Sequence, residues 1–194
     1  MFHETLAPTT DGPLAQSVKI LIAGGFGVGK TTMVAAISEI TPLRTEEVIT
    51  ESSTGIDDLT GVEGKTTTTV ALDFGRISID PGLVLYLFGT PGQDRFWFLW
   101  DELARGALGA VVLADTRRLE SSFAAIDFFE RRHIGFCVGV NIFDGAPYYT
   151  AEEVREALDL DDRVPILLCD ARDRASCKRA LVTLVEYLVV RSGG

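Results

Sequence analysis

The segment VKILIAGGFGVGKTTMVAAISEI, residues 18–40, decides the fold of this chain. Its centre, GGFGVGKT at residues 24–31, has the pattern G-x-x-x-x-G-K-[ST] of a phosphate-binding loop. The apolar residues 18–23 predict a buried strand before the loop, and residues 31–40 predict a helix after it, so bound phosphate would lie at a helix N-terminus. The alternative, a glycine-rich turn with an unrelated lysine, needs four fixed positions to match by chance. We therefore expect nucleotide binding.

Each residue type in this loop suits a phosphate ligand. The glycines allow the backbone to turn its N–H groups inward around an anion. Lys30 places a positive charge on the β- and γ-phosphates, and the Thr31 hydroxyl is a ligand for Mg²⁺. The nucleotide-binding residues expected here are Gly25, Phe26, Gly27, Val28, Gly29, Lys30, Thr31 and Thr32.

The composition argues against several classes of protein. A net charge of −10 disfavours nucleic acid or anionic lipid as the main partner. The three cysteines are odd in number and lack C-x-x-C spacing, which indicates buried, reduced thiols in a cytosolic protein. With two histidines in the whole chain, a zinc site is not expected.

The chain has the length of one domain. Residues 1–16 are polar and rich in proline and threonine, which predicts a flexible tail before a single domain over residues 17–192. No apolar run is long enough to span a bilayer, and no lipidation motif is present. We expect a cytoplasmic protein without direct membrane insertion, which a partner must recruit if it works at a membrane.

Near-continuous apolar strands alternate with helices, a pattern typical of a parallel sheet covered on both faces. We expect an α/β fold with a mostly parallel six-stranded sheet, in which a hairpin at residues 80–82 supplies one antiparallel edge strand. Residues 42–65 are too polar for a core and are expected to be functional or mobile. Strands are predicted at residues 18–23, 66–79, 83–89, 110–115, 136–141 and 164–169.

Helices are predicted near residues 31–40, 94–105, 119–132, 150–158 and 175–191. Thr150 and Glu153 have the spacing of a capping box at the start of the fourth. The last helix has apolar residues at the spacing of a buried face.

Three short segments follow predicted strands in the order found in Ras-like small GTPases. TPGQ at residues 90–93 stands where that family has D-x-x-G-Q, and NIFD at residues 141–144 stands where it has N-K-x-D. DAR at residues 170–172 resembles its S-A-K loop. The chain thus resembles Ras-like small GTPases over most of its length. This implies a P-loop NTPase of the Ras-like G-domain type, with GTP or GDP and Mg²⁺ as ligands.

A closer resemblance is to a bacterial branch of these proteins. The GTPGQ variant at residues 89–93, the threonine run before ALDFG and the N-x-F-D motif are similar to the conservon-type GTPases of actinomycetes. They are more distantly similar to MglA-like polarity GTPases. This resemblance implies two partners, a roadblock/LC7-type protein and a sensor-kinase-like membrane protein.

The resemblance also implies how guanine is bound. Asn141 would tie its loop to the phosphate-binding loop, and the Ala171 N–H would meet the guanine O6. Asp144 would accept hydrogen bonds from the N1–H and the exocyclic amine of guanine, a donor pair that adenine lacks. The alternative is an ordinary polar turn after a strand. The expected base-binding residues are Asn141, Ile142, Asp144, Ala171 and Arg172.

Hydrolysis is assigned by the same resemblance. Gln93 would orient the attacking water, the Gly92 N–H would sense the γ-phosphate, and Lys30 would stabilise charge. Of the threonines at residues 66–69, one should close over Mg²⁺ beside Thr31. Thr69 fits best, the other three stay open, and all four can instead be ordinary strand residues.

Three positions depart from the family pattern. Gly89 replaces the Asp that organises Mg²⁺ through water, and Ile142 replaces the Lys that packs along the base. Phe26 replaces a glycine and would crowd Gln93 or an arginine finger, so we expect slow hydrolysis. No arginine in the sequence declares itself as a finger supplied in cis. The candidates are Arg44, Arg76 and Arg95, and a solvated surface charge is the favoured interpretation of each.

An aromatic segment, RFWFLWDEL at residues 95–103, follows the predicted switch glutamine. Its apolar residues cannot all face the core from one short helix, so part of it is expected to bind a partner. Core packing is the alternative for some of them. The predicted partner-binding residues are Phe96, Trp97, Phe98 and Trp100.

The sequence therefore favours a guanine-nucleotide switch, a slow GTPase that signals through its switch regions. Two alternatives stay open. One is a nucleotide-loaded binding scaffold with little turnover, and the other is an ATP-dependent P-loop enzyme.

Overall fold

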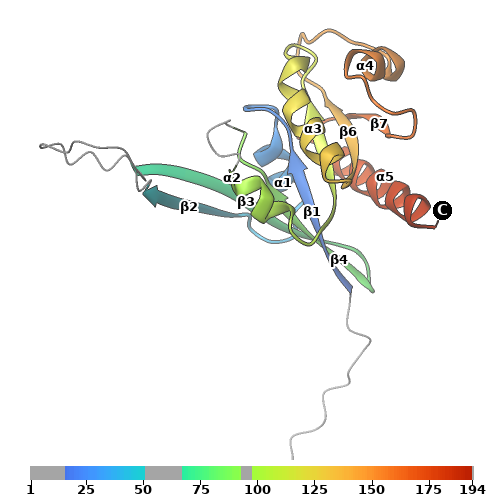
Figure 1. Cartoon of the computed structure of the whole chain (residues 1–194). Coiled ribbons are helices and arrows are strands. Elements are labelled where there is room, and N and C mark those ends of the chain that lie inside the picture. Colours follow the sequence, from blue (N-terminus) through green and yellow to red (C-terminus); the bar gives the residue numbers. More distant parts are fainter. Residues whose placement is uncertain (1–15, 51–66, 93–97, 194) are drawn as a thin grey trace, which may run out of the picture.

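The computed structural model describes residues 16–50, 67–92 and 98–193, and gives the backbone alone for residues 44–50 and 67–71 (Figure 1). Several predictions concern residues outside this description: the N-terminal tail to residue 15, the switch candidates Thr66 and Gln93, the candidate finger Arg95, and the aromatic residues Phe96 and Trp97. Gln16, assigned to the tail, already belongs to the first strand.

One sheet forms the centre of the described chain, with seven strands in the order β2-β3-β4-β1-β5-β6-β7. Strands β4, β1, β5, β6 and β7 are parallel, and β3 runs antiparallel to both of its neighbours. The strands are β1 Gln16–Ala23, β2 Leu43–Thr50, β3 Thr67–Asp80, β4 Leu83–Gly89, β5 Ala107–Ala114, β6 Gly135–Asn141 and β7 Ile166–Cys169.

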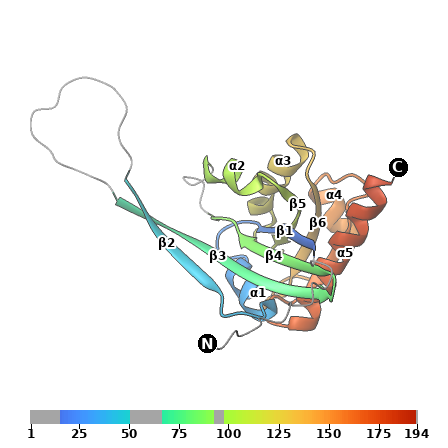
Figure 2. The same ribbon diagram turned by 90° about the horizontal axis from the view of Figure 1, so that it is seen from below.

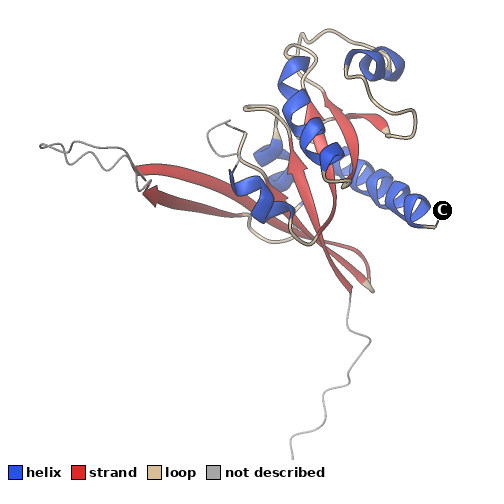
Figure 3. Cartoon of the chain, viewed as in Figure 1, coloured by secondary structure: helices blue, strands red, loops and turns tan. Residues whose placement is uncertain are grey.

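The predicted α/β fold class is confirmed, but the edge of the sheet differs from the prediction. Residues 43–50, for which no strand was predicted within the polar segment 42–65, form β2 and pair with β3 from Leu43–Phe74 to Thr50–Thr67. The antiparallel strand β3 is therefore second from the edge. Because β3 is 14 residues long, much of its backbone would lack hydrogen-bond partners without β2. Both strands extend beyond the helical layers (Figures 2 and 3).

Helices cover both faces of the sheet (Figure 2). One layer contains α1 Lys30–Ile37 and α5 Arg174–Ser192. The other contains α2 Phe98–Ala104, α3 Phe123–Arg131, a 3-10 turn over Leu119–Ser122 just before it, and α4 Ala151–Ala157. None of the helices in the described ranges is long and apolar enough to cross a membrane.

Alternation along the strands creates two apolar cores, one on each side of the sheet. In β1, Ile20 and Ile22 face the α1–α5 layer, whereas Leu21 and Ala23 face the α2–α3 layer. This is the two-residue period of a strand that is buried on both faces. The three cysteines all lie in the core on the α1–α5 side as free, buried thiols, as predicted.

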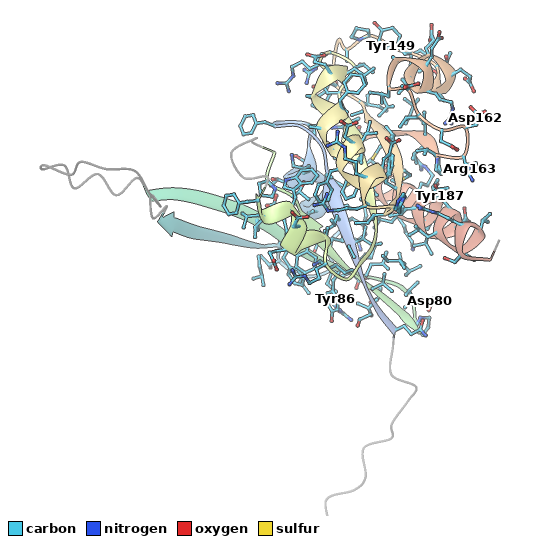
Figure 4. All side chains as sticks on the ribbon, in the orientation of Figure 1. Asp80, Tyr86, Tyr149, Asp162, Arg163 and Tyr187 are labelled. Carbon is cyan, nitrogen blue, oxygen red and sulfur yellow. The ribbon has the colours of Figure 1, made fainter. Side chains whose placement is uncertain are left out.

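Predicted caps and turns form at the ends of several elements. Thr150 accepts from the Glu153 N–H, and the Glu153 carboxylate accepts from the Thr150 N–H, which completes the capping box of α4. At the β3–β4 turn, the Asp80 carboxylate accepts from the Gly82 N–H (Figure 4). The Gly82 carbonyl in turn accepts from the Gln16 N–H at the start of β1.

Trp100 is part of the core rather than the surface. It is 2% exposed, its Nε1–H donates to the Pro91 carbonyl at 3.2 Å, and its ring packs on Phe128 and Phe129. In this structure, Trp100 therefore has no exposed ring for the predicted contact with a partner. Phe98 on the same helix is 54% exposed.

We predict opposite consequences for the two aromatic residues of α2. Trp100→Ala should lower the free energy of unfolding by about 3–5 kcal/mol, because it leaves a cavity between α2 and α3. Phe98→Ala should change it by no more than about 0.5 kcal/mol. Urea unfolding followed by circular dichroism measures both, and equal losses would contradict the assignment of Trp100 to the core.

Candidate functional site

The candidate site lies where the carboxyl ends of the parallel strands meet, the usual binding edge of such sheets. Each of these strands ends in a loop with polar or glycine residues. The loops follow β1 at residues 24–29, β4 at residues 90–92, β5 at residues 115–118, β6 at residues 142–149 and β7 at residues 170–173.

Lys30 is held against its own loop. Its ammonium is buried and donates to the carbonyl oxygens of Gly24 at 2.8 Å and Gly25 at 2.6 Å. Burial lowers the pKa of Lys30 from its ordinary value to about 8, and the nearby Asp73 carboxylate acts in the opposite direction. A phosphate at this position would replace carbonyl dipoles with full negative charges.

Gly92 lies directly on the phosphate-binding loop. A Cβ atom at this residue would be 2.6 Å from the Lys30 Nζ and 2.9 Å from the Phe26 Cα, so only glycine fits. The structure therefore places Gly92 beside Lys30. The predicted contact between the Gly92 N–H and a γ-phosphate requires this position. The neighbouring Pro91 carbonyl is the one that accepts from Trp100.

Asn141 joins the phosphate end of the site to the base end. Its Nδ2–H donates to the Val28 carbonyl at 2.9 Å, and its Oδ1 accepts from the Ala171 N–H at 2.9 Å. The first bond is the predicted tie to the phosphate-binding loop. Gly29 makes the approach possible, because its φ of 106° and a distance of 2.6 Å from its hypothetical Cβ to Asn141 Nδ2 exclude a side chain.

The Ala171 N–H differs from its expected role. It was predicted to meet the guanine O6, but in this structure it donates to Asn141. The Arg172 N–H is also engaged, since it donates to the Asp170 carboxylate at 2.9 Å. In this structure, these two N–H groups thus bond within the protein and hold the loop in place.

The remaining predicted base-binding side chains are open to solvent. The Ile142 side chain presents an exposed apolar surface beside Asn141. The Asp144 side chain is 92% exposed, with the Arg172 guanidinium at 3.7 Å. Hydrogen bonds from Arg172 lower the pKa of Asp170, so this carboxylate stays ionised.

The predicted metal ligand Thr31 faces a carboxylate. Its Oγ1–H donates to Asp73 Oδ2 at 2.5 Å. This pairing suits Mg²⁺, which prefers hard oxygen ligands, but no group of three or more acidic, histidine or cysteine side chains surrounds a common point in the described part of the chain. A cation here would need phosphate oxygens to complete its coordination. Thr32 lies exposed on α1, and Thr69 pairs with Val48 through the backbone, its side chain lying outside the description.

A cluster that the sequence analysis missed lies at the end of β5. The buried Asp115 carboxylate accepts a bidentate pair of hydrogen bonds from Arg117 at 2.9 and 2.8 Å, and these bonds lower its pKa. Arg117 also stacks on the Phe143 ring of the base loop at 3.8 Å. Arg118 lies 3.6 Å from Asp115 and donates to the Phe26 carbonyl at 3.2 Å. The run DTRR at residues 115–118, directly after a buried strand, was the available signal.

Arg118 thereby reaches the phosphate-binding loop, beside a cavity of about 450 Å³ lined by Phe26, Gly92 and Trp100. The three arginines named in the sequence analysis as candidate fingers lie elsewhere or outside the description. Arg76 lies in β3 at 4.0 Å from Glu39, the side chain of Arg44 is outside the description, and Arg95 falls in an undescribed range.

Comparisons by sequence relate this chain to a protein family and to an uncharacterized protein. A family model described as "Conserved hypothetical ATP binding protein" matches residues 22–191. An uncharacterized protein of Methanocaldococcus jannaschii is 28% identical over 137 residues, which are 70% of this chain and 76% of that protein.

Similar solved structures include FeoB domains. The cytosolic domain of the T. maritima FeoB iron transporter in a GDP form has a TM-score of 0.64 and 18% identity, covering 91% of this chain and 65% of that one. The FeoB G domain from Methanococcus jannaschii has a TM-score of 0.60 and 14% identity, covering 89% of this chain and 98% of that one. At such identities the likeness shows a shared fold, and this chain spans about 65% of the larger domain's length.

We predict that nucleotide binding is coupled to proton uptake by Lys30. The free lysine has a pKa of about 8, and bound phosphates should raise it, so the complex holds more protons than the free protein. Binding should take up about half a proton at pH 8 and about a tenth at pH 7, and affinity should fall as the pH rises through 8. Calorimetry in buffers of different ionisation enthalpy measures the uptake. Zero uptake at pH 8 would contradict the prediction.

Proposed function

We propose that this chain, which belongs to the family described as conserved hypothetical ATP binding protein, is a nucleotide-binding molecular switch whose nucleotide is GTP or GDP with Mg²⁺. It hydrolyses GTP slowly and signals to a protein partner through the loop after β4 and helix α2. The G-domain fold of its structural neighbours supports this proposal.

One observation carries the proposal more than any other, the double hydrogen bond of Asn141. A buried amide that bonds to both Val28 and Ala171 fixes the loops after β6 and β7 relative to the phosphate-binding loop. A phosphate chain in that loop would then place a base beside Ile142 and Asp144. The phosphate-binding loop and the loops after β6 and β7 are thus held at a fixed separation. This arrangement favours a nucleoside phosphate, which has both a phosphate chain and a base, over a free phosphate.

Asp144 is the basis for proposing guanine. A carboxylate accepts from two N–H donors on the Watson–Crick edge of guanine, whereas adenine presents an unprotonated N1 there. The description of the family supports a second candidate, an ATP-binding protein. The two candidates differ in what removal of the Asp144 carboxylate does.

We predict that the wild-type protein binds GDP much more tightly than ADP, and that Asp144→Ala weakens GDP binding about 100-fold, because two charge-assisted hydrogen bonds are lost. ADP binding should change little. Asp162→Ala is a matched control, since Asp162 lies on an exposed loop before β7 (Figure 4). Competition against a fluorescent GDP analogue measures all affinities. Preference of the wild type for ADP would favour the ATP candidate.

The phosphate end supplies charge and orientation for hydrolysis. Lys30 would turn its ammonium from the Gly24 and Gly25 carbonyls to the phosphates, and the Gly92 N–H would approach the γ-phosphate from the same side. Mg²⁺, held by Thr31 and by a threonine of β3, would neutralise charge on the phosphate oxygens. Gln93 keeps its proposed role of orienting water, by resemblance.

Arg118 adds a cation in cis. It replaces the candidates Arg44, Arg76 and Arg95 in our proposal, because its guanidinium already lies on the phosphate-binding loop, 3.2 Å from the Phe26 carbonyl. A guanidinium there can stabilise charge that develops on the phosphates during hydrolysis. The same guanidinium nitrogen lies 3.6 Å from the Asp115 carboxylate, which helps to hold it there.

We predict that Arg118→Ala lowers the single-turnover rate of GTP hydrolysis by at least about tenfold and leaves GDP affinity within about twofold. Arg131→Ala is the matched control, because Arg131 forms an exposed ion pair with Asp127 on α3. Rapid-quench kinetics with pre-bound GTP measure the rate. A fall in GDP affinity as large as the fall in rate would assign Arg118 to binding instead.

A partner surface is proposed at α2 and α3. Phe98 is exposed at a groove of about 550 Å³ that Asp101, Phe128 and Arg132 also line. With Phe96 and Trp97, it would form the aromatic contact for a roadblock/LC7-type partner, and a sensor-kinase-like membrane protein would act upstream. If turnover is negligible even with a partner, the scaffold alternative holds.

A further inference from the structure

Gly89 and Asp73 face each other across the β3–β4 strand pair. They are direct partners in the antiparallel register. A Cβ atom on Gly89 would lie 3.1 Å from the Asp73 Cβ and 3.3 Å from its Oδ2. The space that a side chain at position 89 would enter is therefore taken by the Asp73 carboxylate.

The same carboxylate contacts the first turn of α1. Asp73 Oδ2 accepts the Thr31 hydroxyl proton at 2.5 Å, and its negative charge also acts on Lys30. Asp73 thus lies beside both the residue expected to bind Mg²⁺ and the residue expected to bind phosphate.

We propose that Asp73 is the carboxylate that organises Mg²⁺ in this protein, in place of the missing carboxylate at Gly89. The inference rests on the proposed function, because it concerns the cation that accompanies the nucleotide. Asp73 is a positioning residue, which acts through the Thr31 hydroxyl and through water.

The chemistry of the hydroxyl explains the arrangement. A threonine hydroxyl has one proton and two lone pairs, so it can donate to Asp73 and still offer a lone pair to a cation. Donation to a carboxylate fixes the direction of that lone pair. Mg²⁺ keeps several of its waters in such sites, and a carboxylate at this distance can accept their protons.

The test is the magnesium dependence of nucleotide release. A fluorescent GDP analogue is bound to the full-length protein, and its release rate is followed at graded free Mg²⁺ and in excess EDTA. The variant Asp73→Asn keeps the shape of the side chain and removes its charge. The matched control is Asp80→Asn, because Asp80 ends the same strand at the turn remote from the site (Figure 4).

We expect Asp73→Asn to raise the Mg²⁺ concentration for half-maximal slowing by about tenfold or more, with the EDTA rate unchanged. Asp80→Asn should match the wild type. An unshifted midpoint in Asp73→Asn would overturn the inference. Release that is faster to the same extent with and without Mg²⁺ would also overturn it, because that result indicates damage to the loop.

The wild-type protein separates this inference from the proposed function. If it binds GDP but Mg²⁺ does not change the release rate, both this inference and the magnesium part of the proposed function are overturned. If it does not bind GDP, the proposed function itself is overturned.

A double variant tests the position of the charge independently. Asp73→Gly combined with Gly89→Asp moves the carboxylate to β4, and glycine at position 73 is needed because two Cβ atoms would lie 3.1 Å apart. The midpoint should return toward the wild-type value relative to Asp73→Gly alone. A double variant no better than Asp73→Gly would contradict the proposal, even if Asp73→Asn fails to fold.

Discussion

The two hydrogen bonds of the Asn141 side chain are the interaction on which the rest of the site depends. Asn141 ends β6 and is 4% exposed, so each polar atom of its amide needs a partner inside the protein. The partners are the Val28 carbonyl and the Ala171 N–H, which lie in loops from β1 and β7. Loops from three strands are thereby held in one arrangement, and Gly29 must stay a glycine for them to approach.

A second chain of contacts leads from the phosphate-binding loop to the proposed partner surface. Gly92 lies on Lys30, the adjacent Pro91 carbonyl accepts from Trp100, and the Trp100 ring packs on α3. A ligand that displaces Gly92 would therefore move a rigidly packed tryptophan rather than a free loop. This gives a physical route by which the state of the nucleotide could reach the surface around Phe98.

In our proposal, Asp73 on β3 supplies the carboxylate that the family resemblance places at position 89 on β4. The two residues are direct partners on antiparallel strands, and the Asp73 carboxylate occupies the space beside Gly89 and accepts from the Thr31 hydroxyl. In the loop after β5, the buried Asp115 carboxylate contacts both Arg117 and Arg118. Arg117 stacks on the base loop, and Arg118 reaches the phosphate-binding loop. Such changes leave the fold intact, because the fold and the site depend on different residues.

The sequence by itself determined the phosphate-binding loop, the fold class and the capping box of α4, because each follows from local spacing or from apolar periodicity, whereas the contact of Asn141 with the phosphate-binding loop was implied by a family resemblance. Tertiary structure alone decided strand β2, the approach of Arg118 to Phe26, and the contact of Asp73 with Thr31. Those features depend on which strand lies beside which and in what register. Likewise, four nearby aromatic residues do not reveal that Trp100 faces the core and Phe98 the solvent, because that choice is made by the helix against which they pack.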